Sequence, residues 1–174
     1  EDGPARSARF HQPFGIVKMG DGAIIITDMA NNRIRKLFKG VVTTIAGGEE
    51  GFSDGPGADA RFTCPCGVAL DTQGRLLVAD VMNRRIRRVT SEGETTTIAG
   101  GNISDCGFAR GVVTAKDGTV FAAFSGFPDG VGTLSADGTV TILAGSDARG
   151  FVDGRGDAGR FRFPMDIAEA PDGE

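Results

Sequence analysis

ARFTCPCGVALDTQGRLLVADVMNRRIRRVTSEGETTTIAGG, residues 60–101, is the stretch that decides the fold. It holds four short runs rich in β-branched residues, at residues 67–70, 75–79, 85–89 and 95–99. Glycine-containing turns at residues 73–74 and 92–93 separate the runs, and no sustained period of 3.6 residues marks a helix. Four short antiparallel strands of this kind predict one blade of a β-propeller.

The same pattern occurs 52 residues earlier in the chain. Residues 2–48 read DGPARSARFHQPFGIVKMGDGAIIITDMANNRIRKLFKGVVTTIAGG, so that Phe10 precedes Phe62, and Asp28 precedes Asp80, by 52 positions. A third, less regular unit covers residues 111–145, and a fourth begins at Asp153 with DGRGDAGRFRFPMDIAEAPDGE. A repeat of about 50 residues is typical of propellers and solenoids, and the hairpin turns favour the propeller.

Four motifs resemble those of a known family. They are ARFxxPxG, an apolar strand that ends in Asp (IIITD, LLVAD), the run Asn-x-Arg-Ile-Arg, and TTIAGG. Together they resemble the NHL repeat over essentially the whole chain. The third unit departs from this pattern, because Phe124 replaces the aspartate and FPDGVG replaces the Asn-x-Arg-Ile-Arg run. The resemblance implies a propeller, usually of six blades, that serves as an interaction module.

We therefore expect an all-β, NHL-like propeller with three four-stranded blades and the first strand of a fourth. The single domain of residues 1–174 should hold blades at about 14–46, 67–99 and 109–144, with a fourth beginning at about 162–170. Half a ring would leave apolar faces and an open strand edge at its ends. We expect the chain to be a piece of a longer ring. The alternative is that two copies associate to close one ring.

Composition excludes several classes of protein. A net charge of -4 argues against a dedicated nucleic-acid or anionic-membrane binder, and no apolar run is long enough for a membrane helix. Cys64 and Cys66 flank Pro65 and are too close for an ordinary disulfide. Free thiols in an intracellular compartment are therefore expected. A bridge from Cys106 to either of them is the alternative, and it would place the protein outside the cell.

Asp28 and Asp80 end the second strand of the first two units, directly before short loops that contain Asn and Arg. A carboxylate at this position can accept hydrogen bonds from the loop backbone and from a guanidinium. Because a catalytic site normally breaks repeat symmetry, we expect a structural clasp here. The residues expected in it are Asp28, Asn32, Arg33, Asp80, Asn83 and Arg85.

The connections between strands fall on two faces, because strand direction alternates within a blade. The turns inside the hairpins are short, whereas the connections between blades at residues 48–66 and 146–165 are long and share a face with residues 80–84. Repeated Phe and Pro anchors favour packing for most of these loops, and the Gly-rich tips are the better binding candidates. The protein-binding residues expected on this face are Glu49, Glu50, Asp80, Asn83, Arg84, Asp147 and Arg149.

Binding of single-stranded RNA is an alternative function. One branch of the NHL proteins binds RNA through a basic propeller face, and the basic residues here are Arg33, Arg35, Lys36, Arg84, Arg85, Arg87 and Arg88. The acidic charge balance and the absence of Tyr and Trp for base stacking argue against this function. We expect these cations on solvated outer strands.

A propeller enzyme is the remaining alternative. Some propellers related to NHL proteins are lyases or lactonases that hold a central metal with His, Asp or Glu. Here His11 is the sole histidine, and no matching carboxylate cluster is evident on the inner strands. We therefore expect a non-catalytic module without cofactor or metal, whose partner is a protein. In the alternative, blades outside this chain would complete the metal site of a lyase or lactonase.

Overall fold

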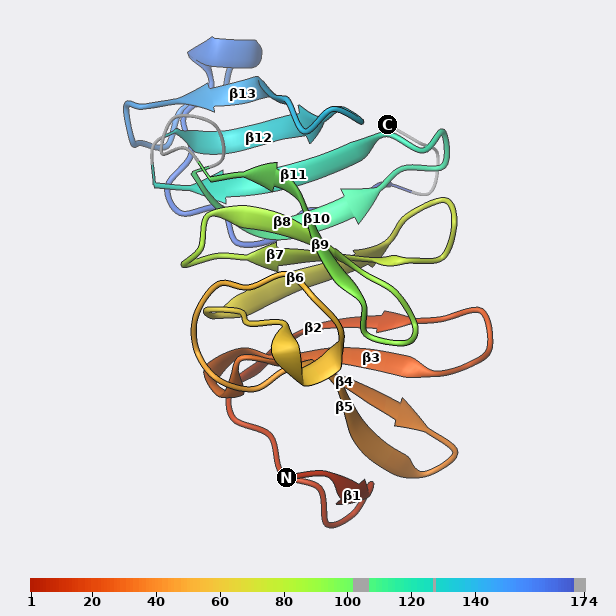
Figure 1. The fold of residues 1–174 in the computed structure, drawn as a ribbon. Helices are drawn as coiled ribbons and strands as arrows, with labels where there is room; N and C mark the ends of the chain where they lie inside the picture. Colours follow the sequence, from red (N-terminus) through yellow and green to blue (C-terminus); the bar gives the residue numbers. More distant parts are fainter. Residues whose placement is uncertain (102–106, 127, 171–174) are drawn as a thin grey trace.

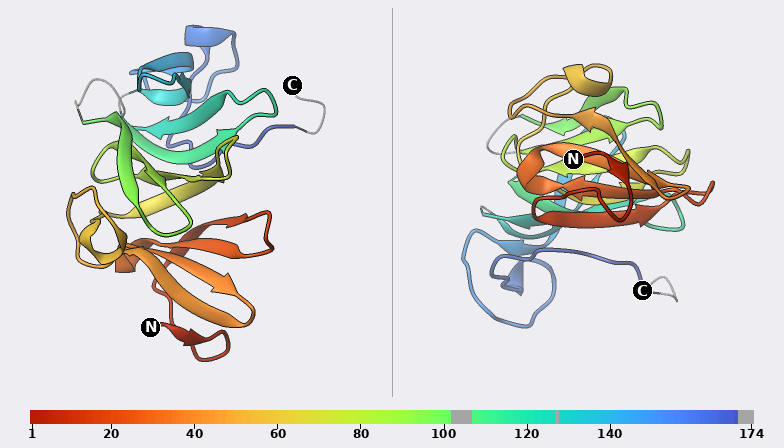
Figure 2. Two further views of the ribbon diagram at one scale, coloured as in Figure 1. Left: turned by 45° about the vertical axis from the view of Figure 1, so that its right-hand side comes forward. Right: turned by 90° about the horizontal axis from the view of Figure 1, so that it is seen from below.

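The computed structural model describes residues 1–101, 107–126 and 128–170. Apart from three 3₁₀ turns, the regular structure in this part of the chain is β-strand, and it holds no helix long and apolar enough to cross a membrane. Three antiparallel sheets are stacked in chain order (Figure 1). The left view in Figure 2 shows this succession, with the N-terminus beside the first sheet. The predicted all-β partial propeller is confirmed.

Each sheet forms one blade, in which strands adjacent in the chain are adjacent in the sheet. In blade 2 the strand ends differ by at most two residues from the apolar runs of the sequence. Blade 1 consists of β2 (Pro13–Lys18), β3 (Ile24–Asp28), β4 (Arg33–Phe38) and β5 (Val41–Gly47). Blade 2 consists of β6 (Pro65–Leu70), β7 (Leu76–Asp80), β8 (Arg85–Val89) and β9 (Thr95–Gly100). Blade 3 consists of β10 (Phe108–Thr114), β11 (Val120–Ser125), β12 (Asp129–Leu134) and β13 (Val140–Ser146).

The Asp-Gly-Pro sequence that opens each of the first two repeats lies along the outer strand of its blade. In blade 1 it forms the short strand β1 (Gly3–Pro4), which pairs with β5. In blade 2 Gly55 pairs with Thr95 of β9 in the same way. The segment that leads into a blade therefore first lies along the outer strand of that blade. It then continues into the blade's inner strand. The 3₁₀ turns lie in loops, at η1 (Met29–Asn31), η2 (Gly57–Asp59) and η3 (Gly156–Ala158).

Neighbouring blades pack closely where an inner strand carries glycine. A Cβ at Gly15 would lie 2.5 Å from the carbonyl oxygen of Cys66, and a Cβ at Gly67 would lie 2.4 Å from that of Arg110. The approach is therefore possible because these positions lack a side chain. The apolar residues between blades 1 and 2 include Ala60 and Phe62 of the second ARF motif.

The two ends of the stack show where a ring would continue. Ile16 of blade 1 is 69% exposed, whereas its repeat counterparts Val68 and Val112 are 9% and 5% exposed because a preceding blade covers them. At the other end, an apolar cleft of about 500 Å³ borders blade 3. Residues 162–170 pass along β10, where a Cβ at Gly111 would lie 2.6 Å from the Cα of Asp166. They form no strand, because the described residues include no further strand of a fourth blade to pair with them.

Candidate functional site

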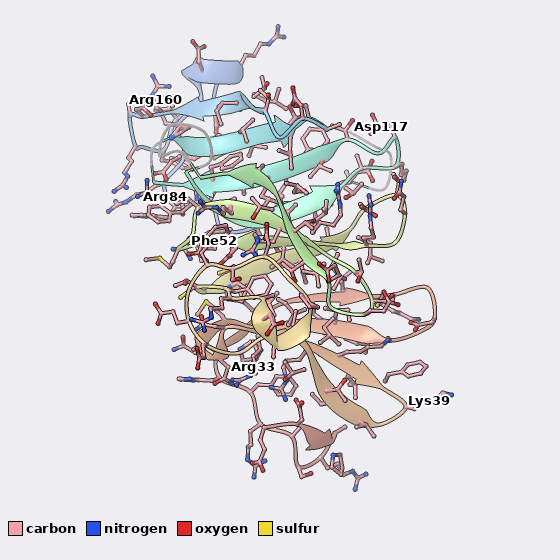
Figure 3. All side chains as sticks on the ribbon, in the orientation of Figure 1. Arg33, Lys39, Phe52, Arg84, Asp117 and Arg160 are labelled. Atoms are coloured by element: carbon pink, nitrogen blue, oxygen red, sulfur yellow. The ribbon has the colours of Figure 1, made fainter. Side chains whose placement is uncertain are left out.

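The connections between strands lie at two opposite edges of the blades. We call one edge the loop face, formed by residues 29–32, 48–64, 81–84 and 147–163. The other is the turn face, formed by residues 19–23, 39–40, 71–75, 90–94, 115–119 and 135–139. Figure 3 shows Arg33, Phe52, Arg84 and Arg160 toward the loop face, and Lys39 and Asp117 at the opposite edge.

A fully buried arginine organises the loop-face end of blade 2. Arg87 is 0% exposed, and its guanidinium contacts Asp80 at 2.8 Å and Asp54 at 2.6 Å. It also donates hydrogen bonds to the carbonyl oxygens of Ser53 and Arg61. The arginine therefore ties the strand that ends in Asp80 to the loop that carries Asp54, and we call this arrangement the Asp–Arg–Asp clasp.

Blade 1 contains the same clasp. Arg35 is 1% exposed and contacts Asp28 at 2.5 Å and Asp2 at 2.7 Å. In this blade the carbonyl oxygens that accept from the guanidinium belong to Glu1 and Arg9. Two copies with the same partners, at equivalent positions of two repeats, make the clasp a structural element.

The arginines of the clasp differ from those expected. Arg35 and Arg87 bond the carboxylates, whereas Arg33 donates to the carbonyl oxygen of Asn31 and Arg85 to that of Asn83. Arg33 and Arg85 stand directly opposite the aspartates at the strand end, so their side chains extend over the loop. Arg35 and Arg87 lie two residues further along the same strands, and their side chains reach the carboxylates of Asp28 and Asp80 diagonally across the sheet. The expectation that these cations all lie on solvated strands is therefore wrong for Arg35 and Arg87.

The asparagines also divide between two roles. Asn31 and Asn83 donate to the buried aspartates of their blades at 2.9 and 2.8 Å. Asn32 was expected in the clasp, but it has a φ of 54° and its side-chain oxygen accepts a hydrogen bond from the N–H of Cys64. Asn32 therefore links blade 1 to the loop of blade 2. Arg84 takes the equivalent left-handed conformation in blade 2, with a φ of 52°.

Acid is expected to weaken the clasps through Asp54 and Asp2. Burial raises the pKa of Asp54, but hydrogen bonds from the Thr97 N–H and the Arg87 guanidinium outweigh burial and hold that pKa below its ordinary value. The pKa of Asp2 is lowered in the same way. A carboxyl whose pKa is lower in the folded chain adds stability above its unfolded-state pKa of about 4, and this stability is lost as the pH falls through the folded-state pKa.

Because of Asp54 and Asp2, the urea midpoint, followed by circular dichroism, should fall below about pH 4. Asp54→Asn removes one of the responsible groups and should make this fall shallower. A fall of the same steepness in the variant would contradict a role for Asp54.

Exposed and half-buried phenylalanines and arginines form a row on the loop face. The Arg85 guanidinium lies 3.9 Å from the ring centre of Phe52, and that of Arg84 lies 4.5 Å from the ring centre of Phe108. Gly126 contacts the Phe108 ring and connects it to the last pair, in which Arg149 lies 4.6 Å from the ring centre of Phe163. We call this set the Phe–Arg row, consisting of Phe52, Arg85, Arg84, Phe108, Arg149 and Phe163.

The row uses only part of the binding set expected from the sequence. Arg84 and Arg149 belong to it. Glu50 and Asp147 are exposed nearby on the loop face, and Glu49 pairs with Arg61 at 2.8 Å. Asp80 is 0% exposed inside the clasp, so its expected role as a contact residue is wrong, and Asn83 is bonded to it. The sequence analysis missed the three phenylalanines of the row, and Phe52 lies in an acidic, Gly-rich segment whose nearest arginine in the sequence is Arg61.

The basic stretch of blade 2 does not form one positive surface. Arg84 and Arg85 lie on the loop face, but Arg87 is inside the clasp. The Arg88 side chain lies toward the turn face, 3.5 Å from a carboxylate oxygen of Asp71. The four arginines therefore point to three different places, which disfavours a continuous track for a nucleic-acid backbone.

Blade 3 replaces the clasp by an apolar core and a single ion pair. Phe124 stands at the position of Asp28 and Asp80, is 1% exposed, and packs with Ile86 and other core residues. Close by, buried Asp129 lies 3.2 Å from the Arg149 guanidinium. Here the arginine comes from the loop, whereas in the two clasps it comes from a strand of the blade.

Cys64 and Cys66 are free thiols, and the alternative that bridges one of them to Cys106 falls on a residue outside the described part of the chain. Burial raises the pKa of the Cys66 thiol to about 11, and burial also raises that of Cys64. Because the thiolate is the reactive form, Cys66 should be alkylated slowly at neutral pH.

At pH 7.5, iodoacetamide should label Cys66 about 100-fold more slowly in the folded chain than in urea, from the two-unit rise in its pKa. Peptide mass spectrometry distinguishes it from Cys64, which is half-buried and should react faster. Equal rates for Cys66 in the folded and unfolded chain would contradict this account.

Metal-binding groups are dispersed. His11 is exposed on the loop-face side, and its backbone N–H donates to Asp28. Within residues 1–101, 107–126 and 128–170, no three His, Cys, Asp or Glu side chains are grouped so that they could hold a metal ion.

Comparison with known proteins places the fold among β-propellers. No family model matches the chain. The chain is 38% identical over 101 residues to Protein SUPPRESSOR OF QUENCHING 1, chloroplastic, of Arabidopsis thaliana. The matched segment covers 56% of this chain and only 10% of that protein.

The similar solved structures span several functions. Virginiamycin B lyase from Staphylococcus aureus matches with a TM-score of 0.58 and 21% identity, over 74% of this chain and 40% of the lyase. A gluconolactonase from Xanthomonas campestris matches with a TM-score of 0.64 and 16% identity, over 79% and 48%. A chain of the nidogen/laminin complex matches with a TM-score of 0.61 and 23% identity, over 79% and 49%. The chain thus has a propeller-type fold and spans less than half of each of these proteins.

Proposed function

We propose that this chain is part of a propeller that binds another protein through its loop face and catalyses no reaction. The Phe–Arg row carries the proposal. Phe52 and Phe163 expose 47% and 46% of their surface beside guanidiniums, and Met82 next to the row is 56% exposed. Phe, Met and Arg are enriched at protein interfaces, and arginine is prominent among the residues that dominate binding energy.

The blade 2 part of the proposed contact surface is held by the clasp. Arg87 bonds Asp54, two residues after Phe52 in the same loop, and Asp80, which pairs with Arg85 at the start of β8. A surface whose loops are already fixed loses less conformational entropy when it binds. The residues assigned to it are Phe52, Met82, Arg84, Arg85, Arg149 and Phe163, with Glu50 and Asp147 at the rim.

We further infer that the repeats are of the NHL type, on the strength of the four motifs in the first two units. The propeller neighbour from the nidogen/laminin complex supports protein binding by this fold. The similarity to the lyase and the gluconolactonase supports the alternative function, in which the chain is part of a propeller enzyme.

The test is selection of binders from a displayed library of protein fragments. Selected fragments should bind the unmodified chain and lose at least tenfold in affinity to a variant with Phe52→Ser and Met82→Ser. The control carries Lys39→Ser and Val41→Ser at the turn face, where both residues are exposed, and should bind as the unmodified chain does. Binders that are indifferent to the loop-face changes would contradict the proposal. So would a stoichiometric metal ion together with lactone hydrolysis or lyase activity.

A further inference from the structure

We infer that the segment received by the loop face is an acidic peptide, whose carboxylates bind Arg84 and Arg85. This inference rests on the proposed function and narrows it to one class of partner. Three properties of the two arginines carry it: their lack of a carboxylate partner among the described residues, their fixed orientation, and the apolar surface around them.

Arg84 and Arg85 have no carboxylate within ion-pair distance in the part of the chain that the structure describes. Six of the other 13 arginines do have one. In a chain with a net charge of -4, two adjacent uncompensated guanidiniums create a local positive site on the loop face. The arginines with a carboxylate partner are Arg35, Arg61, Arg75, Arg87, Arg88 and Arg149.

Both guanidiniums are held in place before any partner binds. Arg85 lies 3.9 Å from the centre of the Phe52 ring and donates to the carbonyl oxygen of Asn83 at 2.8 Å. Arg84 lies 4.5 Å from the centre of the Phe108 ring. A guanidinium stacked on a ring keeps donors at its edge, where a carboxylate can accept two parallel hydrogen bonds.

The position of Arg84 strengthens the assignment. Its counterpart in blade 1 is Asn32, a residue type that tolerates the left-handed conformation and that bonds the next blade through its side chain. Arg84 adopts the same φ, but its side chain lies on Phe108 of blade 3. Blade 2 therefore carries a cation where blade 1 carries a linking amide.

The surroundings favour a peptide over a nucleic acid. Phe52 and Met82 are 47% and 56% exposed and provide apolar contacts beside the two cations. The next cation of the row, Arg149, is paired with Asp129 at 3.2 Å. Within the Phe–Arg row, Arg84 and Arg85 are thus the cations without a carboxylate partner among the described residues, which suits a few carboxylates spaced by apolar residues rather than a continuous phosphate backbone.

The test uses a displayed library of random 12-residue peptides. Peptides selected on the unmodified chain should be rich in Asp and Glu. Synthetic versions with these residues changed to Asn and Gln should bind at least tenfold more weakly, because charge-assisted hydrogen bonds are lost. On a variant with Arg84→Asn and Arg85→Gln, the acidic and amide versions should differ by less than about twofold. Arg84→Asn installs the residue that blade 1 uses, and circular dichroism checks that the variant folds.

Lys18→Gln with Lys39→Gln is the matched control, since it removes two exposed charges at the opposite face. It should retain the full preference for the acidic peptides, and loss of that preference would overturn the inference in favour of general charge attraction. Peptides that bind the loop face without acidic enrichment would overturn the inference but leave the proposed function standing. If no peptide or protein fragment binds the loop face, both fail. Retention of a labelled 12-nucleotide oligouridylate that depends on Arg84 and Arg85, without acidic-peptide binding, would replace the inference by RNA binding.

Discussion

Replacing Arg87 by Met is expected to lower the free energy of unfolding by about 3–5 kcal/mol, the range found when one partner of a buried ion pair is removed. Arg87 and Asp80 are both 0% exposed, so the variant leaves a buried carboxylate without its countercharge. The two carbonyl oxygens that accept from the guanidinium also lose their donor. Methionine fills much of the arginine volume, so a cavity contributes little to the effect.

Urea unfolding followed by circular dichroism measures this effect, since the chain has no Trp for fluorescence. Arg75→Met is the matched control, because Arg75 forms a more exposed pair with Asp71, and its loss should cost no more than about 1 kcal/mol. Adding Asp80→Asn to Arg87→Met should recover part of the loss by removing the unpaired charge. Equal stability of the Arg87 and Arg75 variants would mean that the clasp is not a structural element.

Gly67→Ala should destabilise the contact between blades 2 and 3 by about 3 kcal/mol, at the upper end of the range for overpacking. The added Cβ would lie 2.4 Å from the carbonyl oxygen of Arg110 and 2.9 Å from the Cα of Gly111. Both are backbone atoms of the neighbouring inner strand, so neither can rotate away. The two blades must separate to accommodate the methyl group.

Gly20→Ala is the control for this substitution. A Cβ at Gly20 would meet no atom within 4 Å, and the residue has no positive φ. The change should therefore be neutral or stabilise the chain by less than about 1 kcal/mol, through the unfolded state. If Gly67→Ala had as small an effect as Gly20→Ala in urea unfolding, the inner strands would not be as tightly packed as described.

Local patterns in the sequence were sufficient for the strands. The apolar runs of the second repeat end within two residues of β6–β9, because alternating side chains and Gly turns act over a few residues. The importance of Asp28 and Asp80 was also evident, since each ends a strand at the same place in its repeat.

The identity of the clasp arginine was not predictable in this way. Arg33 and Arg35 both follow Asp28 within a few residues and lie two apart on one strand. Which of them becomes buried depends on Asp2, whose loop folds back along β5 to reach Arg35. That choice involves residues 33 positions apart and the path of a segment whose pairing with β5 is limited to the two residues of β1. The Phe–Arg row likewise joins Phe52 to Arg85 and Arg84 to Phe108 across different blades.

The central claim is that the loop face, held by the clasps, is the binding surface. Hydrogen–deuterium exchange of the chain, alone and saturated with a selected protein fragment, tests it most directly. The account predicts slower exchange at residues 49–54, 81–85 and 147–151, with residues 71–75 and 90–94 of the turn face unchanged. Protection confined to the turn face or to the inner strands would contradict it.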